Sequence, residues 1–338
     1  MTSSASSVFQ ANEIEAQVFN QLQQGRESIY RELAKQIVGQ RETIDQLLIS
    51  LLAGGHCLIT GAPGLAKTLL VRSVAQIFHL DFSRIQFTPD LMPADITGTE
   101  ILQESHHTHR ELKFVRGPIF ANVILADEIN RTPPKTQAAL LEAMQEHQVT
   151  TAGHRHPLEE PFFVLATQNP IEMEGTYPLP EAQLDRFMFN VLIDYLPHEE
   201  ELEVVLQTTQ SKSESIQPLF TGEDVLRFQE VVRRVPIARE VADYAVRLVA
   251  ASRPGQPGTA DEINQWVSWG AGLRAAQTLV IGGKARALLR GETHVRFEDI
   301  RQLAHPTLRH RILLSYKADA EGITVEDLID RLLENVLQ

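Results

Sequence analysis

The stretch that decides the fold is Gly61-Ala62-Pro63-Gly64-Leu65-Ala66-Lys67-Thr68. It lies between the short apolar run His56–Thr60 and a helical pattern that begins at Lys67 and continues to Ile77. A loop at this place turns its backbone N–H groups and the positive end of the helix dipole toward an anion such as a phosphate. The lysine can then reach the β- and γ-phosphates, and the threonine hydroxyl can bind Mg²⁺. The sequence therefore predicts that residues 61–68 hold the phosphates of a nucleotide.

One position of this loop departs from the usual pattern. Glycine normally stands directly before the lysine, and this chain has Ala66 there. An alanine fits only where φ is compatible with a Cβ atom. The alternative is a Gly-Pro turn that joins a strand to a helix and binds nothing. The next motif helps to decide between these two interpretations.

That motif is an apolar strand, residues 123–126, which ends in the carboxylates Asp127 and Glu128. Ligands of open α/β sheets sit at the carboxyl ends of the strands, so both side chains are expected beside the loop. Asp127 would help to hold Mg²⁺, and Glu128 would orient or deprotonate the attacking water. For the pair taken alone, a strand end with two solvated acids is the alternative. Together, the loop and the pair predict nucleotide hydrolysis.

Short apolar runs alternate with helical patterns over residues 1–197. The runs are His56–Thr60, Arg84–Phe87, Asn122–Ala126, Phe162–Thr167 and Asn190–Asp194. Near-continuous apolar strands separated by helices are typical of a parallel sheet that is covered on both faces. We therefore expect an α/β layered fold. Its expected helices are Ala11–Ile37 with an interruption around Gly25, Thr43–Ala53, Lys67–Ile77 and Pro134–Glu146.

Only helical patterns follow Pro197. The expected helices are His198–Gln207, Gly222–Val232, Ala238–Ala251, Ile263–Ile281, Phe297–Ala304 and Val325–Val336. Loops rich in glycine and proline, such as residues 253–258, separate them. The sequence therefore predicts two domains, a nucleotide-binding core over residues 1–197 and a helical domain over residues 198–338.

Composition narrows the class of protein. The chain has 31 Lys and Arg against 44 Asp and Glu, and this net charge of −13 disfavours binding to a nucleic-acid backbone. Its single cysteine, Cys57, excludes an intrachain disulfide and agrees with a reducing compartment. Residues 1–7 lack the basic and apolar parts of a signal peptide, and the most apolar stretch, Leu47–Ile59, is too short to span a bilayer. We expect a cytoplasmic protein without a membrane segment.

Several motifs together resemble the MoxR family of AAA+ ATPases. They are GAPGLAKT (61–68), LADEINR (125–131), PPKTQAALLEAMQE (133–146), ATQNP (166–170) and EGTYPLPEAQLDRF (174–187). The resemblance extends from Val38 to the C-terminal helices, and an alanine before the lysine is usual in this family. It implies an AAA+ P-loop NTPase, an α/β fold with a five-stranded parallel sheet between helices, followed by an all-α lid domain. ATP and Mg²⁺ are the implied cofactors.

The resemblance also assigns roles around the nucleotide. It implies that Val38, Gly39 and Gln40 contact the adenine, and that Leu69 joins residues 61–68 and Asp127 in holding the nucleotide. Thr68 and Asp127 are the implied magnesium-site residues, in part through water. Asn169, at the end of the fourth strand, matches the polar sensor that positions the attacking water. Taken alone, Asn169 could equally open an Asn-Pro turn.

Two arginines match the family's catalytic arginines. Arg186 matches the finger that reaches the γ-phosphate of the neighbouring subunit, where a planar cation can speed phosphoryl transfer roughly 10³- to 10⁵-fold. A surface ion pair with Asp185 or Glu181 is the alternative. Arg274 matches the second sensor of the lid, although the family more often has Ser-Pro where this chain has Gly272-Leu273. Arg131 is a further candidate for the subunit interface.

Two insertions also fit the family. Residues 89–115 resemble an insert in the second helix, and residues 148–161, with Gly153 at a turn, are expected to form a β-hairpin. In such proteins these loops project into the central pore or toward the client protein.

The leading hypothesis is an ATP-driven chaperone that forms a ring, expected to be a hexamer. The resemblance implies that it matures other protein complexes or assists metal-cofactor insertion, together with a partner that has a von Willebrand factor A domain. The sequence does not identify the client. A metal-chelatase-like motor subunit, a nucleic-acid-dependent motor and a nucleotide-dependent scaffold with negligible turnover are the alternatives.

Overall fold

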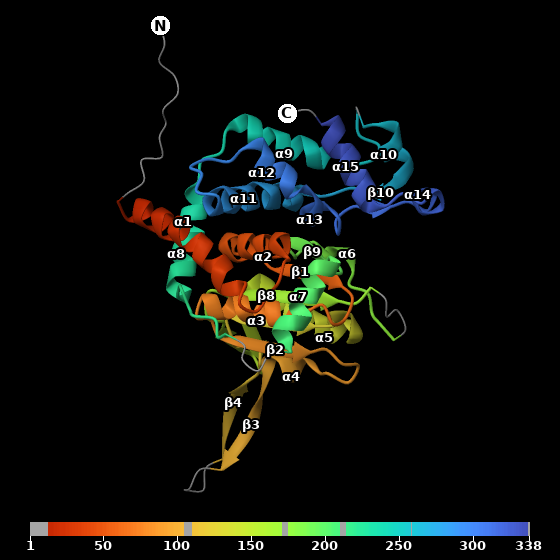
Figure 1. Ribbon diagram of the computed structural model, residues 1–338. Helices are drawn as coiled ribbons and strands as arrows, with labels where there is room; N and C mark the ends of the chain where they lie inside the picture. The colour runs from red at the N-terminus through yellow and green to blue at the C-terminus, as the bar shows by residue number, and fades with distance from the viewer. Residues whose placement is uncertain (1–12, 105–109, 171–174, 210–213, 258, 337–338) are drawn as a thin grey trace. The chain divides into compact units, whose positions relative to one another are not determined.

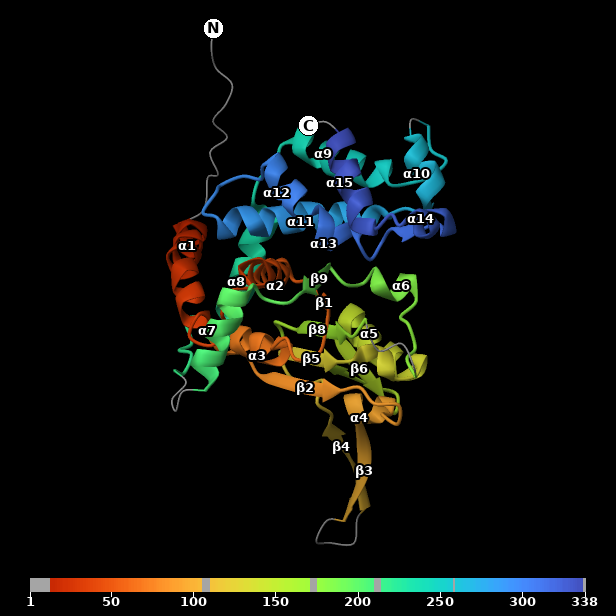
Figure 2. The ribbon, with the colours of Figure 1, turned by 45° about the vertical axis from the view of Figure 1, so that its right-hand side comes forward.

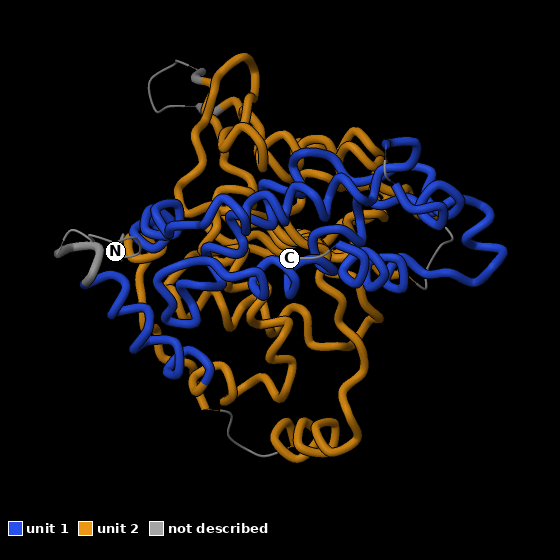
Figure 3. The backbone as a smooth tube through the Cα atoms, turned by 90° about the horizontal axis from the view of Figure 1, so that it is seen from above, with its two compact units in different colours: residues 1–30, 226–338 blue, residues 31–225 orange. Residues whose placement is uncertain are grey.

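The structure is a computed structural model, and it describes residues 13–104, 110–170, 175–209, 214–257 and 259–336 (Figure 1). The chain divides into two compact units. One unit is Arg31–Val225, and the other combines Met1–Tyr30 with Leu226–Gln338 (Figure 3). This grouping differs from the division expected at residue 197. It assigns most of the first helix to the unit of C-terminal helices, and it leaves α7 (His198–Thr208) in the unit of the sheet.

A five-stranded parallel sheet forms the centre of the unit Arg31–Val225. Its strands lie in the order β2-β5-β8-β1-β9, and every pair of neighbours is parallel. The strands are β1 (Cys57–Gly61), β2 (Phe82–Gln86), β5 (Val123–Asp127), β8 (Phe163–Gln168) and β9 (Phe189–Ile193). Each overlaps one of the expected apolar runs, so the predicted sheet is confirmed. Strand β1 lies inside the sheet, and the loop 61–66 follows it directly.

Burial explains why these runs form strands. In β5 and β8 every residue except the last is buried, as expected for strands covered on both faces. The core on one side of the sheet combines strand residues such as Ile124 and Val164 with helix residues such as Leu140 and Met144. The last residues of the same strands, Asp127 among them, are only partly buried, which leaves polar side chains available at the carboxyl edge.

The helices of this unit join the strands and cover the sheet. They are α2 (Arg41–Ala53), α3 (Lys67–Ile77), α4 (Pro93–Thr97), α5 (Pro134–Glu146), α6 (Glu181–Leu184) and α7, with a short 3₁₀ turn at Ile129–Arg131. Helices α3 and α5 have the bounds expected from the sequence. Helix α8 (Gly222–Arg234) continues into the second unit.

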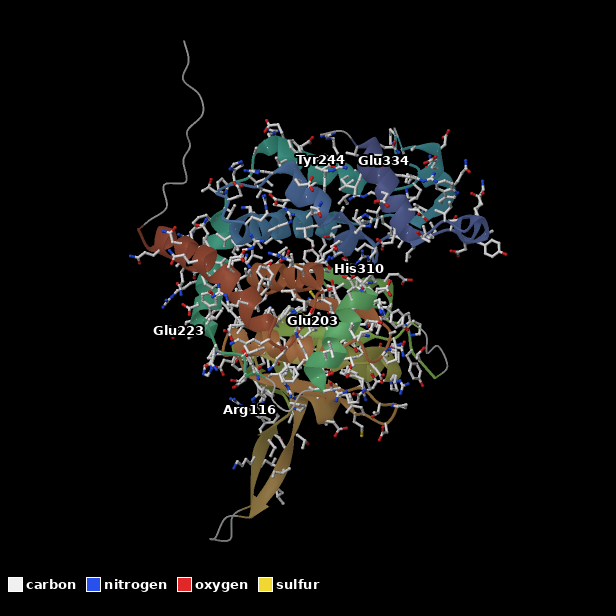
Figure 4. All side chains as sticks on the ribbon, viewed as in Figure 1. Arg116, Glu203, Glu223, Tyr244, His310 and Glu334 are labelled. Atoms are coloured by element: carbon white, nitrogen blue, oxygen red, sulfur yellow. The ribbon has the colours of Figure 1, made fainter. Side chains whose placement is uncertain are left out.

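Two antiparallel hairpins leave the sheet unit. Strands β3 (Gly98–Glu104) and β4 (Arg110–Arg116) form a hairpin that extends away from the sheet, with Arg116 labelled where it rejoins the unit (Figures 2 and 4). This hairpin lies in the expected insert 89–115, whose residues 105–109 are outside the described residues. Strands β6 (Gln148–Thr151) and β7 (His154–Pro157) pair within the expected hairpin 148–161. The ring of Phe114 stacks on His156 with 3.9 Å between ring centroids, so the two hairpins pack together.

The second unit is mainly helical. It contains α9 (Arg239–Ala251), α10 (Asp261–Trp266), α11 (Leu273–Leu289), α12 (Phe297–Gln302), α13 (Ala304–Leu308), α14 (Tyr316–Glu321) and α15 (Val325–Asn335). Tyr244 of α9 is fully buried among them (Figure 4). Among the described residues of both units, no helix is long and apolar enough to cross a membrane.

Three expectations about the helices are wrong. The first helix, α1 (Glu13–Leu33), continues through Gly25 because buried residues on either side, Leu22 and Ile29, outweigh the roughly 1 kcal/mol cost of a glycine. The expected helix 263–281 is instead α10, strand β10 (Val267–Trp269) and α11. Between β10 and α11 the backbone packs closely against Ser252, and a Cβ at Gly270 would lie 2.4 Å from the carbonyl oxygen of Ser252. Strand β10 pairs with β11 (Leu313–Leu314), so strands do not end at residue 197.

Candidate nucleotide site

The loop between β1 and α3 owes its shape to a few residues. Gly64 has a φ of 85°, and a Cβ on it would meet nothing within 4 Å, so its glycine serves backbone conformation. A Cβ on Gly61 would lie 2.4 Å from the carbonyl oxygen of Ile193, so this glycine allows close packing. Ala66 has a φ of 54° and a ψ of 22°, in the left-handed region. The alanine is therefore accommodated at a cost in strain, about 1–2 kcal/mol, and not by a conformation suited to Cβ.

Lys67 is the first residue of α3, and its ammonium lies half-buried beside the loop. Its Nζ donates a hydrogen bond to the carbonyl oxygen of Gly61. Burial lowers the pKa of Lys67, while the nearby charges of Asp127 and Glu128 act to raise it. The lysine and the two carboxylates therefore interact across one site.

The two carboxylates are fixed by neighbours on β8 and β2. Thr167 donates its hydroxyl hydrogen to Asp127 Oδ1 over 2.7 Å and accepts the backbone N–H of Glu128 over 2.8 Å. Gln86 Nε2 donates to Glu128 Oε2 over 3.0 Å. Glu128 has a φ of 56°, a strained conformation that persists only where the surroundings enforce it. The strand ends thus hold Glu128 in one orientation.

A pocket of about 460 Å³ opens among these residues. It is lined by Pro63, Gly64, Leu65, Ala66, Lys67, Thr68, Leu69, Arg84, Gln86, Asp127, Glu128, Thr167 and Asn169. The structure therefore brings most of the predicted phosphate loop together with the acidic pair and Asn169. Gly61 and Ala62 belong to the same loop but are not among the lining residues.

The donor set of the pocket fits Mg²⁺. Thr68 and Asp127 offer a hydroxyl and a carboxylate, and Mg²⁺ is commonly held by one or two carboxylates, waters and substrate phosphates. Within the described residues, no group of three or more His, Cys, Asp and Glu side chains could hold a metal ion. The hydroxyl of Thr68 and the carboxylate of Asp127 could hold Mg²⁺ together with water and the phosphates of a nucleotide.

Comparisons with known proteins agree with this geometry. Residues 56–189 match the model of the ATPase family associated with various cellular activities (AAA), and residues 260–332 match the AAA lid domain. The chain is 43% identical to Chaperone MoxR1 of Mycobacterium tuberculosis over 305 residues, which cover 90% of this chain and 80% of that protein. The chain belongs to the MoxR family of AAA+ ATPases.

Two further relatives extend the comparison. Protein MoxR of Methylorubrum extorquens is 30% identical over 335 residues, which cover 90% of this chain and 93% of that one. A crystal structure of a candidate ATPase from Cytophaga hutchinsonii superposes with a TM-score of 0.88 at 43% identity, over 96% of this chain and 97% of that chain. The MoxR-type fold, a parallel sheet core and a helical lid, is thus shared along nearly the whole chain.

The segment Val38-Gly39-Gln40, which the sequence predicts to contact the adenine, lies just before α2. Gly39 and Gln40 have φ values of 64° and 52°, and a Cβ on Gly39 would lie 1.8 Å from Glu200 Oε2 of α7. The positive φ of residue 39 favours glycine, whereas the flexible Glu200 side chain could move away from a Cβ. None of the three residues lines the 460 Å³ pocket, and their contact with adenine stays a prediction.

A second pocket, of about 650 Å³, shares Leu69 with the first. Its lining residues come from the end of α1, from α3 and from the end of α7, and they are Arg31, Ala34, Lys35, Gln36, Leu69, Arg72, Gln76, Gln207, Thr208 and Glu214. Leu69 lines both pockets, so they are adjacent at the first turn of α3.

Arg186 and Arg274, the two arginines predicted to act in catalysis, are not among the residues that line the 460 Å³ pocket. Arg186 Nη1 donates to the carbonyl oxygen of Leu141, in the middle of α5, over 2.9 Å. Arg274 is exposed in the first turn of α11, in the other unit. A Cβ at Gly272, before this turn, would meet nothing within 4 Å, so a serine would fit at this position. The roles of both arginines stay predictions.

The sequence analysis missed three residues of the pocket, namely Arg84, Gln86 and Thr167. Arg84 and Gln86 alternate with the buried Ile85 and Phe87 along the edge strand β2, and this alternation was the available signal. Thr167 stands in the motif ATQNP, two residues before the predicted sensor Asn169. Its role depends on the pairing of β5 with β8, which no local pattern reveals.

Proposed function

We propose that the 460 Å³ pocket binds MgATP and hydrolyses it. The observation that carries the proposal is the joint placement of Lys67, Asp127 and Glu128 around a phosphate loop at the carboxyl ends of β1 and β5. Two carboxylates and one ammonium beside such a loop match the requirements of phosphoryl transfer to water. A loop that only joined strand to helix would not need the strained orientation of Glu128.

Each side chain has a distinct task in this reaction. Lys67 and the backbone N–H groups of residues 61–68 would bind the β- and γ-phosphates. Thr68 and Asp127 would hold Mg²⁺, which neutralises phosphate charge when it is bound. Glu128 would accept the proton of the attacking water, and Asn169 would position that water against the γ-phosphate.

The position of Arg186 supports the proposal that the protein acts as an oligomer. Its guanidinium is bonded to Leu141 in the middle of α5 and does not line the pocket of its own chain, which suits a residue that serves a neighbouring copy. We assign Arg186 as the finger in trans, Arg274 as the second sensor from the lid, and a ring of six as the assembly. Closed cyclic rings of identical subunits place one such arginine at every interface.

The biological role we propose is that of a chaperone for protein complexes in the cytoplasm. Support comes from the Mycobacterium tuberculosis relative, which is named a chaperone. A partner with a von Willebrand factor A domain and assistance in metal-cofactor insertion follow from the family resemblance. The hairpins β3–β4 and β6–β7 are the surfaces we assign to client contact.

The experiment that tests the reaction compares ATP binding and phosphate release for three variants. Lys67→Ala should lose ATP binding, because the loop loses its cation. Glu128→Gln should keep ATP binding and lose turnover, because the amide cannot accept the proton of water. Glu142→Gln, an exposed carboxylate of α5, is the matched control and should behave as the unmodified protein.

Equal turnover in Glu128→Gln and the unmodified protein would contradict the proposed role of Glu128. Tight ATP binding by Lys67→Ala would contradict the assignment of the phosphate loop. If the reaction is confirmed, ATP-loaded Glu128→Gln is the form with which to capture the client, since it is expected to remain in the ATP state.

A further inference from the structure

Both oxygens of Asp127 are engaged by protein groups. Thr167 donates to Oδ1 over 2.7 Å, and Arg84 donates to Oδ2 from both Nη2, over 2.6 Å, and Nε, over 3.0 Å. Charge-assisted bonds from a guanidinium to a carboxylate are among the stronger polar contacts in proteins. The carboxylate assigned to Mg²⁺ therefore already has a cationic partner.

The position of Arg84 follows from the pairing of the two strands. Strand β2 lies beside β5 with Gln86 opposite Asp127. Arg84 is opposite Leu125, two residues before Asp127 along the paired strands. Its side chain reaches along the strand to the carboxylate and lines the same pocket as Lys67 and Thr68. Side-chain exposure is 48% for Arg84 and 16% for Asp127, so the guanidinium can turn toward solvent without leaving a buried cavity.

We propose that Arg84 is an exchangeable counter-ion of Asp127, which Mg²⁺ must displace from Oδ2 when the metal enters with the nucleotide. The proposal rests on the MgATP site proposed above. A carboxylate oxygen cannot accept two bonds from one guanidinium and also approach a Mg²⁺ ion closely, because the two cations repel each other. Arg84 is thus a positioning residue that competes with the metal.

Displacement of Arg84 also changes the surroundings of Glu128. Arg84 Nη2 donates to Gln86 Oε1 over 2.6 Å, and Gln86 Nε2 donates to Glu128 Oε2 over 3.0 Å. When the guanidinium leaves, Gln86 loses the partner that fixes its amide. Metal entry at Asp127 is thereby coupled, through two side chains of β2, to the carboxylate that acts on water.

The test measures metal affinity and not turnover. Mn²⁺ replaces Mg²⁺ as a paramagnetic probe, and free Mn²⁺ is counted by electron paramagnetic resonance while the full chain is saturated with ADP. Arg84→Gln should bind Mn²⁺ about tenfold more tightly than the unmodified protein, a change equivalent to about 1.4 kcal/mol. Arg72→Gln is the matched control, because it removes one exposed arginine that packs over Phe82 instead of a carboxylate. It should leave the affinity unchanged.

Two further variants separate competition from a supporting role. Arg84→Lys keeps the charge with a single donor group, so its Mn²⁺ affinity should fall between those of Arg84→Gln and the unmodified protein. In the background of Asp127→Asn, Arg84→Gln should have no effect on Mn²⁺ affinity. If Arg84→Gln fails to fold, as judged by its thermal midpoint with EDTA, the Arg84→Lys measurement decides.

Unchanged or weaker Mn²⁺ binding by these Arg84 variants would overturn the proposal and leave Arg84 as a support for Asp127. The proposed function itself would be contradicted if the unmodified protein bound no Mn²⁺ in the presence of ADP, because the pocket would then not be a metal–nucleotide site. Failure of the Arg84 proposal and failure of the proposed function therefore give different results.

Discussion

Ala66 carries a Cβ and still adopts the left-handed backbone of the phosphate loop, with a φ of 54°. Glu128, across the pocket, does the same with a φ of 56°. Two non-glycine residues in this sparsely populated region face one ligand site, and such strain tends to concentrate at functional sites. The strained backbone at Ala66 and Glu128 therefore lowers the stability of the folded protein while it sets the orientation of Lys67 and Glu128 at the pocket.

The strain at Ala66 predicts a stabilising substitution. Ala66→Gly should raise the thermal midpoint by roughly 1–2 °C, because relief of about 1–2 kcal/mol of strain exceeds the added flexibility of the unfolded chain. Ala62→Gly is the matched control in the same loop, since Ala62 is not among the described residues with positive φ. The control should lower the midpoint by a similar amount. Scanning calorimetry checks both, and equal shifts of the same sign would contradict the strain at Ala66.

At this scale the sequence anticipated the residues that chemistry requires. Lys67, Thr68, Asp127 and Glu128 stand in motifs that predict their roles, and the pocket brings all four side chains together. Arg84 was invisible because its partner is 43 residues away and is reached only through the pairing of β2 with β5. Contacts between strands that are distant in sequence leave no local pattern.

Among the elements, β1 is joined to α5 and β8 through His56, which directly precedes it. The backbone N–H of Val164 donates to His56 Nδ1 over 3.1 Å, and His56 Nε2 faces the carbonyl oxygen of Met144 over 3.2 Å. Because Nδ1 accepts, Nε2 must carry the proton and donate. Burial lowers the pKa of His56 to about 4. The neutral imidazole is therefore part of the packing of these three elements.

A pH dependence of stability follows from this arrangement. The unfolded histidine gains a proton below about pH 6.5, whereas folded His56 stays neutral until about pH 4. The unfolded state binds more protons in between, so stability falls as the pH decreases through this window, by up to about 3 kcal/mol. His56→Gln should show a shallower decrease in its urea midpoint from pH 6.5 to 4, even though it is less stable at pH 7. A decrease as steep as that of the unmodified protein would assign the effect to other groups.

The elements themselves were predictable where pattern and packing agree. Helices α3 and α5 begin at the residues that the sequence indicated, because a loop motif and a proline mark their starts. The region 263–281 was misjudged because its apolar spacing continues across Gly270, where the chain instead packs against Ser252. Apolar periodicity predicts which residues are buried, but it does not predict where a helix ends and the backbone turns.

For the whole molecule, the most consequential observation is that Arg186 does not line the 460 Å³ pocket of its own chain. The pocket of one chain contains most of the predicted phosphate loop, the acidic pair and Asn169, whereas the guanidinium of Arg186 is bonded to Leu141 in the middle of α5. The arginine finger must then come from another copy if the assignment of Arg186 is right. Activity would be a property of the assembly, and dilution below the assembly concentration would abolish it.

Mixed assemblies test this last point. Arg186→Ala should lower turnover by roughly 10³-fold or more while ATP binding persists, because its own pocket is intact and its neighbour lacks the finger. Lys67→Ala should be inactive for the opposite reason, since it keeps the finger and loses the pocket. In an equal mixture, about one interface in four pairs an intact pocket with an intact finger in a cyclic ring, so turnover should recover to about that fraction. Phosphate release, measured before and after subunit exchange, reports the recovery.

The controls for this mixture depend on the same geometry. Arg247→Ala, an arginine of α9 paired with Asp243, removes an equal charge and should be active alone. Each inactive variant mixed with itself should stay inactive, which excludes contamination by unmodified protein. If Arg186→Ala and Lys67→Ala exchange subunits, as judged by light scattering and a fluorescent label, and turnover stays at the level of the single variants, then Arg186 does not act in trans. Arg186 would in that case stabilise the fold through its bond to α5. Arg131 would then be the next candidate for an arginine that acts on the pocket of a neighbouring subunit.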